Sequence, residues 1–148
     1  MYRKKLPIGI QTFREIREAD YYYVDKSPLA LRLIDGGKYY FLSRPRRFGK
    51  SLFLDMLGEL FAGSEALFQG LYAHDRWDWS TVYPVIRISF AEGVLKGRAA
   101  LDQRIDEILA ENEERFGLKP STEACSIPGR LLPLFAMPTS NLVNASSY

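Results

Sequence analysis

The 148-residue chain is 47% hydrophobic and 26% charged, which excludes an intrinsically disordered protein and allows one domain with a sizeable core. Its net charge of +2 falls short of a nucleic-acid-binding composition, although basic residues outnumber acidic ones in residues 1–60 and acidic ones predominate afterwards. Cys125 is the single cysteine, so an internal disulfide and a cysteine metal site are both excluded.

Residues 1–38 predict a helical lead-in that starts with one short helix. Thr12 and Glu15 have the spacing of a capping box, in which each side chain bonds a free backbone N–H of the first turn. Phe13 and Ile16 then share one face of the helix. This pattern predicts a short helix with these two apolar side chains on one face.

A second helix is predicted after Ser27, which is typical of an N-cap, with Pro28 at the first helical position. Gly36 and Gly37 end this helix because glycine tolerates a positive φ angle. Before it, Asp25-Lys26 fits either a solvated charged pair or a contact to a nucleotide base or ribose.

A strand, a basic loop and a helix are expected in the next segment. Tyr39–Ser43 is a short apolar strand candidate, and Ser51–Ala62 predicts a strongly apolar helix. Between them, Gly49-Lys50-Ser51 matches the end of the phosphate-binding pattern G-x-x-x-x-G-K-[ST]. In that pattern the loop N–H groups and the positive helix end bind a polyphosphate, the lysine reaches its terminal phosphates, and the serine ligates Mg²⁺. The first glycine of the pattern is replaced here by Arg44.

The loop supplies the candidate site for ATP and Mg²⁺, with Ser51 as the metal ligand. Like charges repel one another unless an anion or an acidic surface meets them, and no acidic residue lies between Lys38 and Asp55. A basic turn with a serine N-cap would not explain why the basic residues Arg44, Arg46, Arg47 and Lys50 crowd together. A non-enzymatic protein that binds nucleic-acid phosphates through the Arg44–Lys50 cluster is the alternative. The candidate ATP-binding residues are Arg44, Pro45, Arg46, Arg47, Phe48, Gly49, Lys50 and Ser51.

Four segments, Leu6–Gly9, Tyr23–Ser27, Tyr39–Ser51 and Tyr83–Ile86, resemble in order and spacing the bacterial AAA-ATPase-like domain proteins. The string Arg-Pro-Arg-Arg-Phe-Gly-Lys-Ser is the usual Walker A loop of that family. The resemblance therefore accounts for Arg44 at the position where the general pattern has its first glycine. It covers roughly residues 5–118. It implies ATP and Mg²⁺ as cofactors. Full-length relatives are expected to continue into a Walker B strand, further ATPase elements and often a C-terminal nuclease-like domain, none of which is recognisable in this sequence.

The second half predicts one more strand, Val85–Phe90, and an amphipathic helix, Arg98–Phe116. Acidic residues of this helix, Glu113 among them, are expected on a solvated face. The segment Leu131–Tyr148 is uncharged and has no steady helical or strand period. The alternation of strands and helices predicts an α/β architecture, a partial P-loop NTPase fold of the AAA-ATPase-like kind, truncated before the Walker B strand. The expected division is a lead-in over 1–38, a P-loop core fragment over 39–118 and an irregular or disordered tail over 119–148.

Hydrolysis of ATP by a P-loop enzyme needs an acid at the end of a second apolar strand. Glu92 is the only acid near a predicted strand end, and the residues before it fit poorly. We therefore expect this chain to bind ATP as the N-terminal fragment of an AAA-ATPase-like protein without hydrolysing it. The basic start lacks the apolar core of a signal peptide, and the uncharged tail is too broken for a membrane helix of about 20 apolar residues. A cytoplasmic location without a membrane partner is the expectation.

Overall fold

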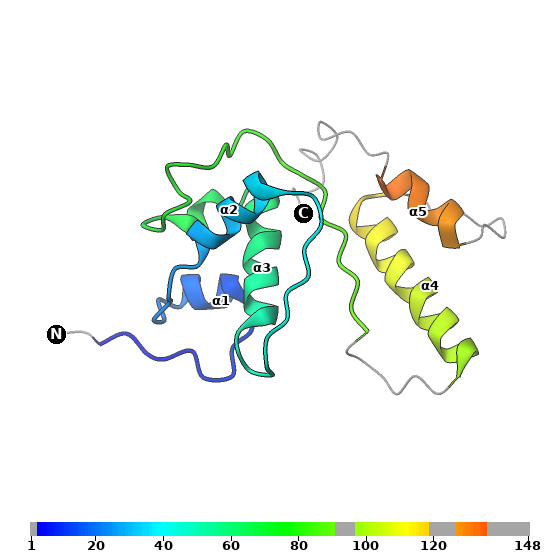
Figure 1. The fold of residues 1–148 in the computed structure, drawn as a ribbon, viewed down its shortest axis with the longest axis horizontal. Helices are drawn as coiled ribbons and strands as arrows, with labels where there is room; N and C mark the ends of the chain where they lie inside the picture. The colour runs from blue at the N-terminus through cyan, green and yellow to red at the C-terminus, as the bar shows by residue number, and fades with distance from the viewer. Residues whose placement is uncertain (1–2, 91–96, 119–126, 136–148) are drawn as a thin grey trace. The chain divides into compact units, whose positions relative to one another are not determined.

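The computed structural model describes residues 3–90, 97–118 and 127–135, and these divide into two helical units, one up to Thr81 and one from Val82 onward (Figure 1). None of the described helices is long and apolar enough to cross a bilayer. The first unit contains α1 (Phe13–Glu18), α2 (Ser27–Gly36), α3 (Lys50–Phe61) and a 3-10 helix, η1 (Glu65–Phe68). The second unit contains α4 (Arg98–Arg115) and α5 (Ile127–Phe135).

The core of the first unit forms where α1, α3 and η1 meet. Phe13 of α1 is fully buried, and its ring lies 5.0 Å from the ring of Phe68 and 5.1 Å from that of Tyr23. Met56 and Leu60 of α3 complete the contact and are also fully buried. The predicted short helix is therefore confirmed, and the structure shows that the face with Phe13 and Ile16 is buried. Burial raises the pKa of Tyr23 to about 12, so its hydroxyl stays protonated in the folded protein.

The predicted capping box of α1 is wrong. The Thr12 side chain makes no capping hydrogen bond. The backbone N–H of Phe13 instead donates to Oδ2 of Asp55 at 2.7 Å. A carboxylate of α3 thus satisfies the N-terminus of α1, where the helix dipole favours a negative charge, and it ties the two helices together.

The other helix boundaries of this unit lie within a residue of the expected ones. Helix α2 starts at Ser27, with Lys26 rather than Ser27 as its N-cap, and ends at Gly36. The Ser27 hydroxyl does not cap the helix but accepts a hydrogen bond from the Ala73 N–H at 3.0 Å. Helix α3 starts at Lys50, directly after Gly49.

The predicted α/β P-loop NTPase fold is wrong, because residues 3–90, 97–118 and 127–135 contain helices and no strand. Tyr39–Ser43 and Val85–Phe90 have strand-like sequences, but neither joins a hydrogen-bonded ladder. A strand is stable only as part of such a ladder, and an apolar segment does not by itself provide the partner.

In the second unit a side chain, not a strand, pairs with the backbone of the predicted Val85–Phe90 strand. The Arg87 N–H donates to Oδ1 of Asn112 at 3.2 Å, and Nδ2 of Asn112 donates to the Arg87 carbonyl at 3.1 Å. Asn112 lies on α4 and is 4% exposed. One buried amide therefore fixes this segment against α4, as a neighbouring strand would otherwise do.

Glu113 of α4 is buried, so its predicted place on a solvated face is wrong. Both of its carboxylate oxygens accept hydrogen bonds from Arg130 of α5, at 2.7 and 2.9 Å. Helix α5 (Ile127–Phe135) also includes residues 131–135, the start of the segment for which the sequence showed no helical period. Residues 136–148 lie outside the described part of the chain, and the predicted divisions at 38/39 and 118/119 stay a prediction.

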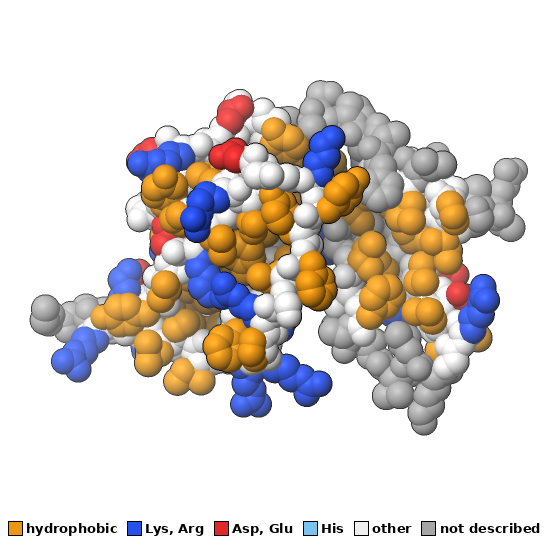
Figure 2. Space-filling model, in the orientation of Figure 1, with side chains coloured by type: hydrophobic (Ala, Val, Ile, Leu, Met, Phe, Trp, Pro, Cys, Tyr) orange, Lys and Arg blue, Asp and Glu red, His pale blue; other side chains and the backbone are white. Residues whose placement is uncertain are grey.

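We expect the isolated chain to self-associate increasingly as its concentration rises. Tyr39 and Phe41 are 94% and 93% exposed, and hydrophobic side chains cover much of the first unit's visible face (Figure 2). Apolar patches of this kind drive association because burying them releases water. Light scattering coupled to size exclusion should show the effect, and Phe41→Lys should reduce it. A monomer at every concentration with a sharp, cooperative thermal transition would contradict this expectation.

Candidate functional site

The basic loop, residues 44–51, turns sharply before α3. Arg47 and Gly49 both have left-handed backbone angles, with φ of 66° and 73°. Gly49 adopts this conformation freely, whereas Arg47 does so at a cost of roughly 1 kcal/mol because its Cβ crowds the backbone. Left-handed residues within a tight turn are typical of anion-binding concavities. A strained non-glycine residue in such a turn points to a functional constraint on the loop.

Lys50 is the first residue of α3, and its side chain folds back onto the loop. Its Nζ donates to the carbonyl of Arg44 and, at 3.1 Å, to the carbonyl of Pro45. The ammonium group therefore lies inside the curve of the loop. These two bonds hold the positive charge at the N-terminus of α3, where the helix dipole already favours an anion.

The remaining loop side chains are open to solvent. Arg44, Arg46, Arg47 and Ser51 are exposed, while Gly49 is half-buried. Within the described ranges, no carboxylate forms an ion pair with the loop's arginines or with Lys50. The loop thus presents a basic surface that carboxylates of the described residues leave unpaired.

A small hollow lies under the loop, with a volume of about 10 Å³, which is room for one water molecule at most. The hollow is therefore too small to enclose a phosphate group. The hollow is lined by Lys26, Leu29, Leu42, Arg44, Phe48, Gly49, Lys50 and Phe53.

Lys26 lies beside the loop and lines the hollow, although the sequence left its role open. A Cβ built on Gly49 would lie 3.2 Å from Nζ of Lys26, so the two residues are in close contact. Lys26 is 23 positions before Gly49, and sequence spacing gives no sign of this approach. The only signal was the Tyr23–Ser27 segment among the resembling motifs.

Other features of the described chain offer less chemistry. A broad groove of about 620 Å³ lies beside α1 and η1, but its arginines are already bonded. Arg14 pairs with Glu59 at 2.8 Å, and Arg17 donates to the carbonyls of Leu67 and Gln69. Both arginines that line the groove are therefore already paired with groups of the described chain.

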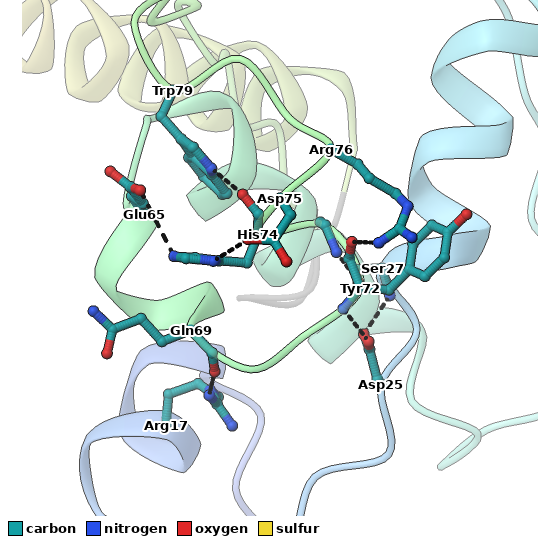
Figure 3. Close-up of polar contacts among 11 residues, drawn as sticks. Arg17, Asp25, Ser27, Glu65, Gln69, Tyr72, His74, Asp75, Arg76 and Trp79 are labelled. Atoms are coloured by element: carbon teal, nitrogen blue, oxygen red, sulfur yellow. Dashed lines mark hydrogen bonds and ion pairs between the residues drawn. The ribbon is translucent and has the colours of Figure 1, made fainter.

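His74 contacts Asp75 at 2.9 Å and lies 3.7 Å from Glu65 (Figure 3). Across the residues that the structure describes, no group of three or more His, Cys, Asp and Glu side chains is arranged to hold a metal ion. Glu92, the sequence's candidate acid, lies outside the described residues.

Comparison with known proteins identifies relatives of this chain. A family model described as "Predicted AAA-ATPase" matches residues 7–143. A protein of Azotobacter chroococcum mcd 1, named "Uncharacterized protein in vnfD 5'region", is 64% identical over 119 residues. That match covers 80% of this chain and 23% of the relative, so the chain spans about a quarter of the relative's length. No solved structure matches this chain. With nearly all of its residues matched, the chain belongs to the AAA-ATPase-like family.

Proposed function

We propose that this chain binds ATP together with Mg²⁺ through the basic loop, residues 44–51. The observation that carries the proposal is the position of Lys50. Its ammonium group lies inside a strained turn at the start of a twelve-residue helix, under exposed arginines that have no carboxylate partner in the described chain. Membership of a predicted ATPase family supports a nucleotide as the anion.

Binding would exchange one set of contacts of Lys50 for another. The ammonium group would leave the carbonyls of Arg44 and Pro45 and bind terminal phosphate oxygens. A phosphate oxygen carries negative charge and a carbonyl oxygen does not, so the new bonds add a Coulombic attraction that the present ones lack. The first N–H groups of α3 also have no acceptor within the helix, so they add donors on the same side.

The residues present suit Mg²⁺. This ion prefers oxygen ligands and keeps several waters, so it is commonly held by one or two protein oxygens and by the phosphates of its substrate. The exposed hydroxyl of Ser51, the second residue of α3, would supply the protein oxygen. The ion would neutralise part of the phosphate charge that the loop's cations face.

Thermal stabilisation by ligand tests the proposal without a labelled nucleotide. A ligand that binds only the folded state at one hundred times its dissociation constant stabilises it by about 2.7 kcal/mol. We expect Mg·ATP to raise the unfolding temperature and AMP to leave it nearly unchanged, because Lys50 and Ser51 would act on the terminal phosphates. Equal shifts with ATP and AMP would contradict a site built on those phosphates.

Binding to nucleic-acid phosphates is the second candidate, and the exposure of Phe48 favours it. This ring is 60% exposed and follows two arginines, an arrangement that suits stacking on unpaired bases. The dependence of binding affinity on salt concentration distinguishes nucleic-acid binding from ATP binding. Each phosphate contact to a single strand adds roughly −0.7 to the slope of log affinity against log salt. A steep slope with oligonucleotides, and no response to Mg·ATP, would select this candidate over ATP.

The isolated chain is expected to hydrolyse ATP no faster than the background rate. None of the side chains that line the hollow is a carboxylate, so the described site lacks a group to orient the attacking water. Phosphate release from pure protein measures this directly. Sustained release that Lys50→Ala abolishes would reveal an acid elsewhere in the chain, and Glu92→Gln would be the first variant to examine.

A further inference from the structure

The turn before α2 is anchored from two sides by Asp25 (Figure 3). Its Oδ1 accepts a hydrogen bond from the Ser27 N–H at 2.8 Å, and its Oδ2 accepts one from the Tyr72 N–H at 2.7 Å. The Ser27 hydroxyl accepts a third bond from the Ala73 N–H. The carboxylate of Asp25 is therefore committed to backbone donors and does not form the solvated pair with Lys26 that the sequence allowed.

This anchoring fixes the backbone of Lys26. Its carbonyl accepts the N–H groups of Leu29 and Ala30, at 3.1 and 3.2 Å, as the first turn of α2 forms. The side chain is half-buried, and it lines the hollow under the loop together with Arg44 and Lys50. Its Nζ lies against the open face of Gly49, 3.2 Å from the position of a Cβ.

No carboxylate or carbonyl of the described residues is bonded to Nζ of Lys26, whereas Lys50 has two carbonyl acceptors. Two ammonium groups that share one partly buried hollow repel each other and are each partly desolvated. A multivalent anion at the loop would offset both costs, and a polyphosphate has the charge and the several acceptor oxygens to do so.

We propose that Lys26 is a second phosphate-binding lysine, which reaches the polyphosphate of the bound nucleotide from the start of α2, beside Gly49. This inference rests on the proposed function and adds a residue and a ligand contact to it. It also gives Gly49 a second role, because a Cβ there would strain the positive φ and would lie 3.2 Å from Nζ of Lys26, so the ammonium group would have to shift by a few tenths of an ångström. The contact is with phosphate, not with the base or ribose, because Gly49 lies within the loop that binds phosphate.

The test is calorimetric titration of the full chain with Mg·ATP and, separately, with inorganic tripolyphosphate. Lys26→Gln should weaken both ligands at least fivefold, since it removes a charge-assisted hydrogen bond. Lys26→Met, which keeps the apolar stem, should do the same, and Lys26→Arg should recover most of the affinity. Arg32→Gln is the matched control, because Arg32 is an exposed cation of α2 outside the lining of the hollow. The unfolding midpoints should not fall below the wild-type value, because the Lys26 side chain makes no hydrogen bond or ion pair within the described chain and its charge is repelled by that of Lys50.

The possible outcomes distinguish failure of the proposed role of Lys26 from failure of the proposed ATP binding. Unchanged affinity for both ligands in the neutral Lys26 variants, with affinity lost in Lys50→Ala, would overturn the role of Lys26 and leave ATP binding intact. Weaker ATP binding with unchanged tripolyphosphate binding would move Lys26 to the base or ribose and overturn the phosphate contact. Failure of the wild-type chain to bind either ligand would overturn the proposed function itself.

Discussion

Replacement of Lys50 by alanine is expected to weaken binding of Mg·ATP at least tenfold, which corresponds to about 1.4 kcal/mol. Lys50 brings its positive charge to the N-terminus of α3, inside the curve of the loop. No neutral side chain could replace the contacts that we propose for Lys50 with the terminal phosphates. A titration of both proteins at low concentration, where self-association is weakest, measures the difference.

Two properties make this substitution a clean test. The carbonyls that Lys50 leaves belong to exposed residues, Arg44 and Pro45, so water satisfies them and the fold loses little. Lys38→Ala is the control, because it removes the same charge from an exposed lysine outside the loop and should leave the affinity unchanged. Equal affinity of the wild-type and Lys50→Ala proteins would place the nucleotide elsewhere.

The largest expected effect on stability comes from Phe13→Ala, which should lower the free energy of unfolding by about 3–5 kcal/mol. Phe13 is fully buried, and its ring contacts the rings of Tyr23 and Phe68. Its removal leaves a cavity at the centre of the first unit, and the rings around it lose their contacts. Typical domains are stable by only 5–15 kcal/mol, so the loss would be a large share of the total.

Fluorescence in a denaturant titration reports on this unit specifically. Both tryptophans of the chain, Trp77 and Trp79, are partly buried against the same core. Phe41→Ala is the matched control, because it removes the same side chain from a site that is 93% exposed and should change the free energy of unfolding by less than about 0.5 kcal/mol. Similar losses for the two variants would show that Phe13 is not the centre of the core.

The local features of the chain could be predicted from its sequence. Helices α1, α2, α3 and α4 start and end close to the expected positions, because each depends on a periodic apolar pattern and on nearby proline or glycine residues. The basic loop was located by its charges and its Gly49-Lys50-Ser51 ending. Each of these signals is contained within a few consecutive residues.

The features that the sequence missed depend on partners far along the chain. Asp55 caps α1 from 42 residues away, and Arg130 neutralises Glu113 from 17 residues away. The predicted sheet failed for the same reason, because Tyr39–Ser43 shows a strand pattern but the pattern does not say whether a partner strand exists. Lys26 was ambiguous until its approach to Gly49 was known.

Backbone hydrogen exchange of the basic loop tests ATP binding at this site most directly. The N–H groups of residues 46–52 would become donors to the phosphates, so their exchange should slow in the presence of saturating Mg·ATP. AMP should leave it unchanged, and Lys50→Ala should remove the effect. Protection by Mg·ATP elsewhere in the chain, with residues 46–52 exchanging as fast as in the free protein, would contradict the proposed site.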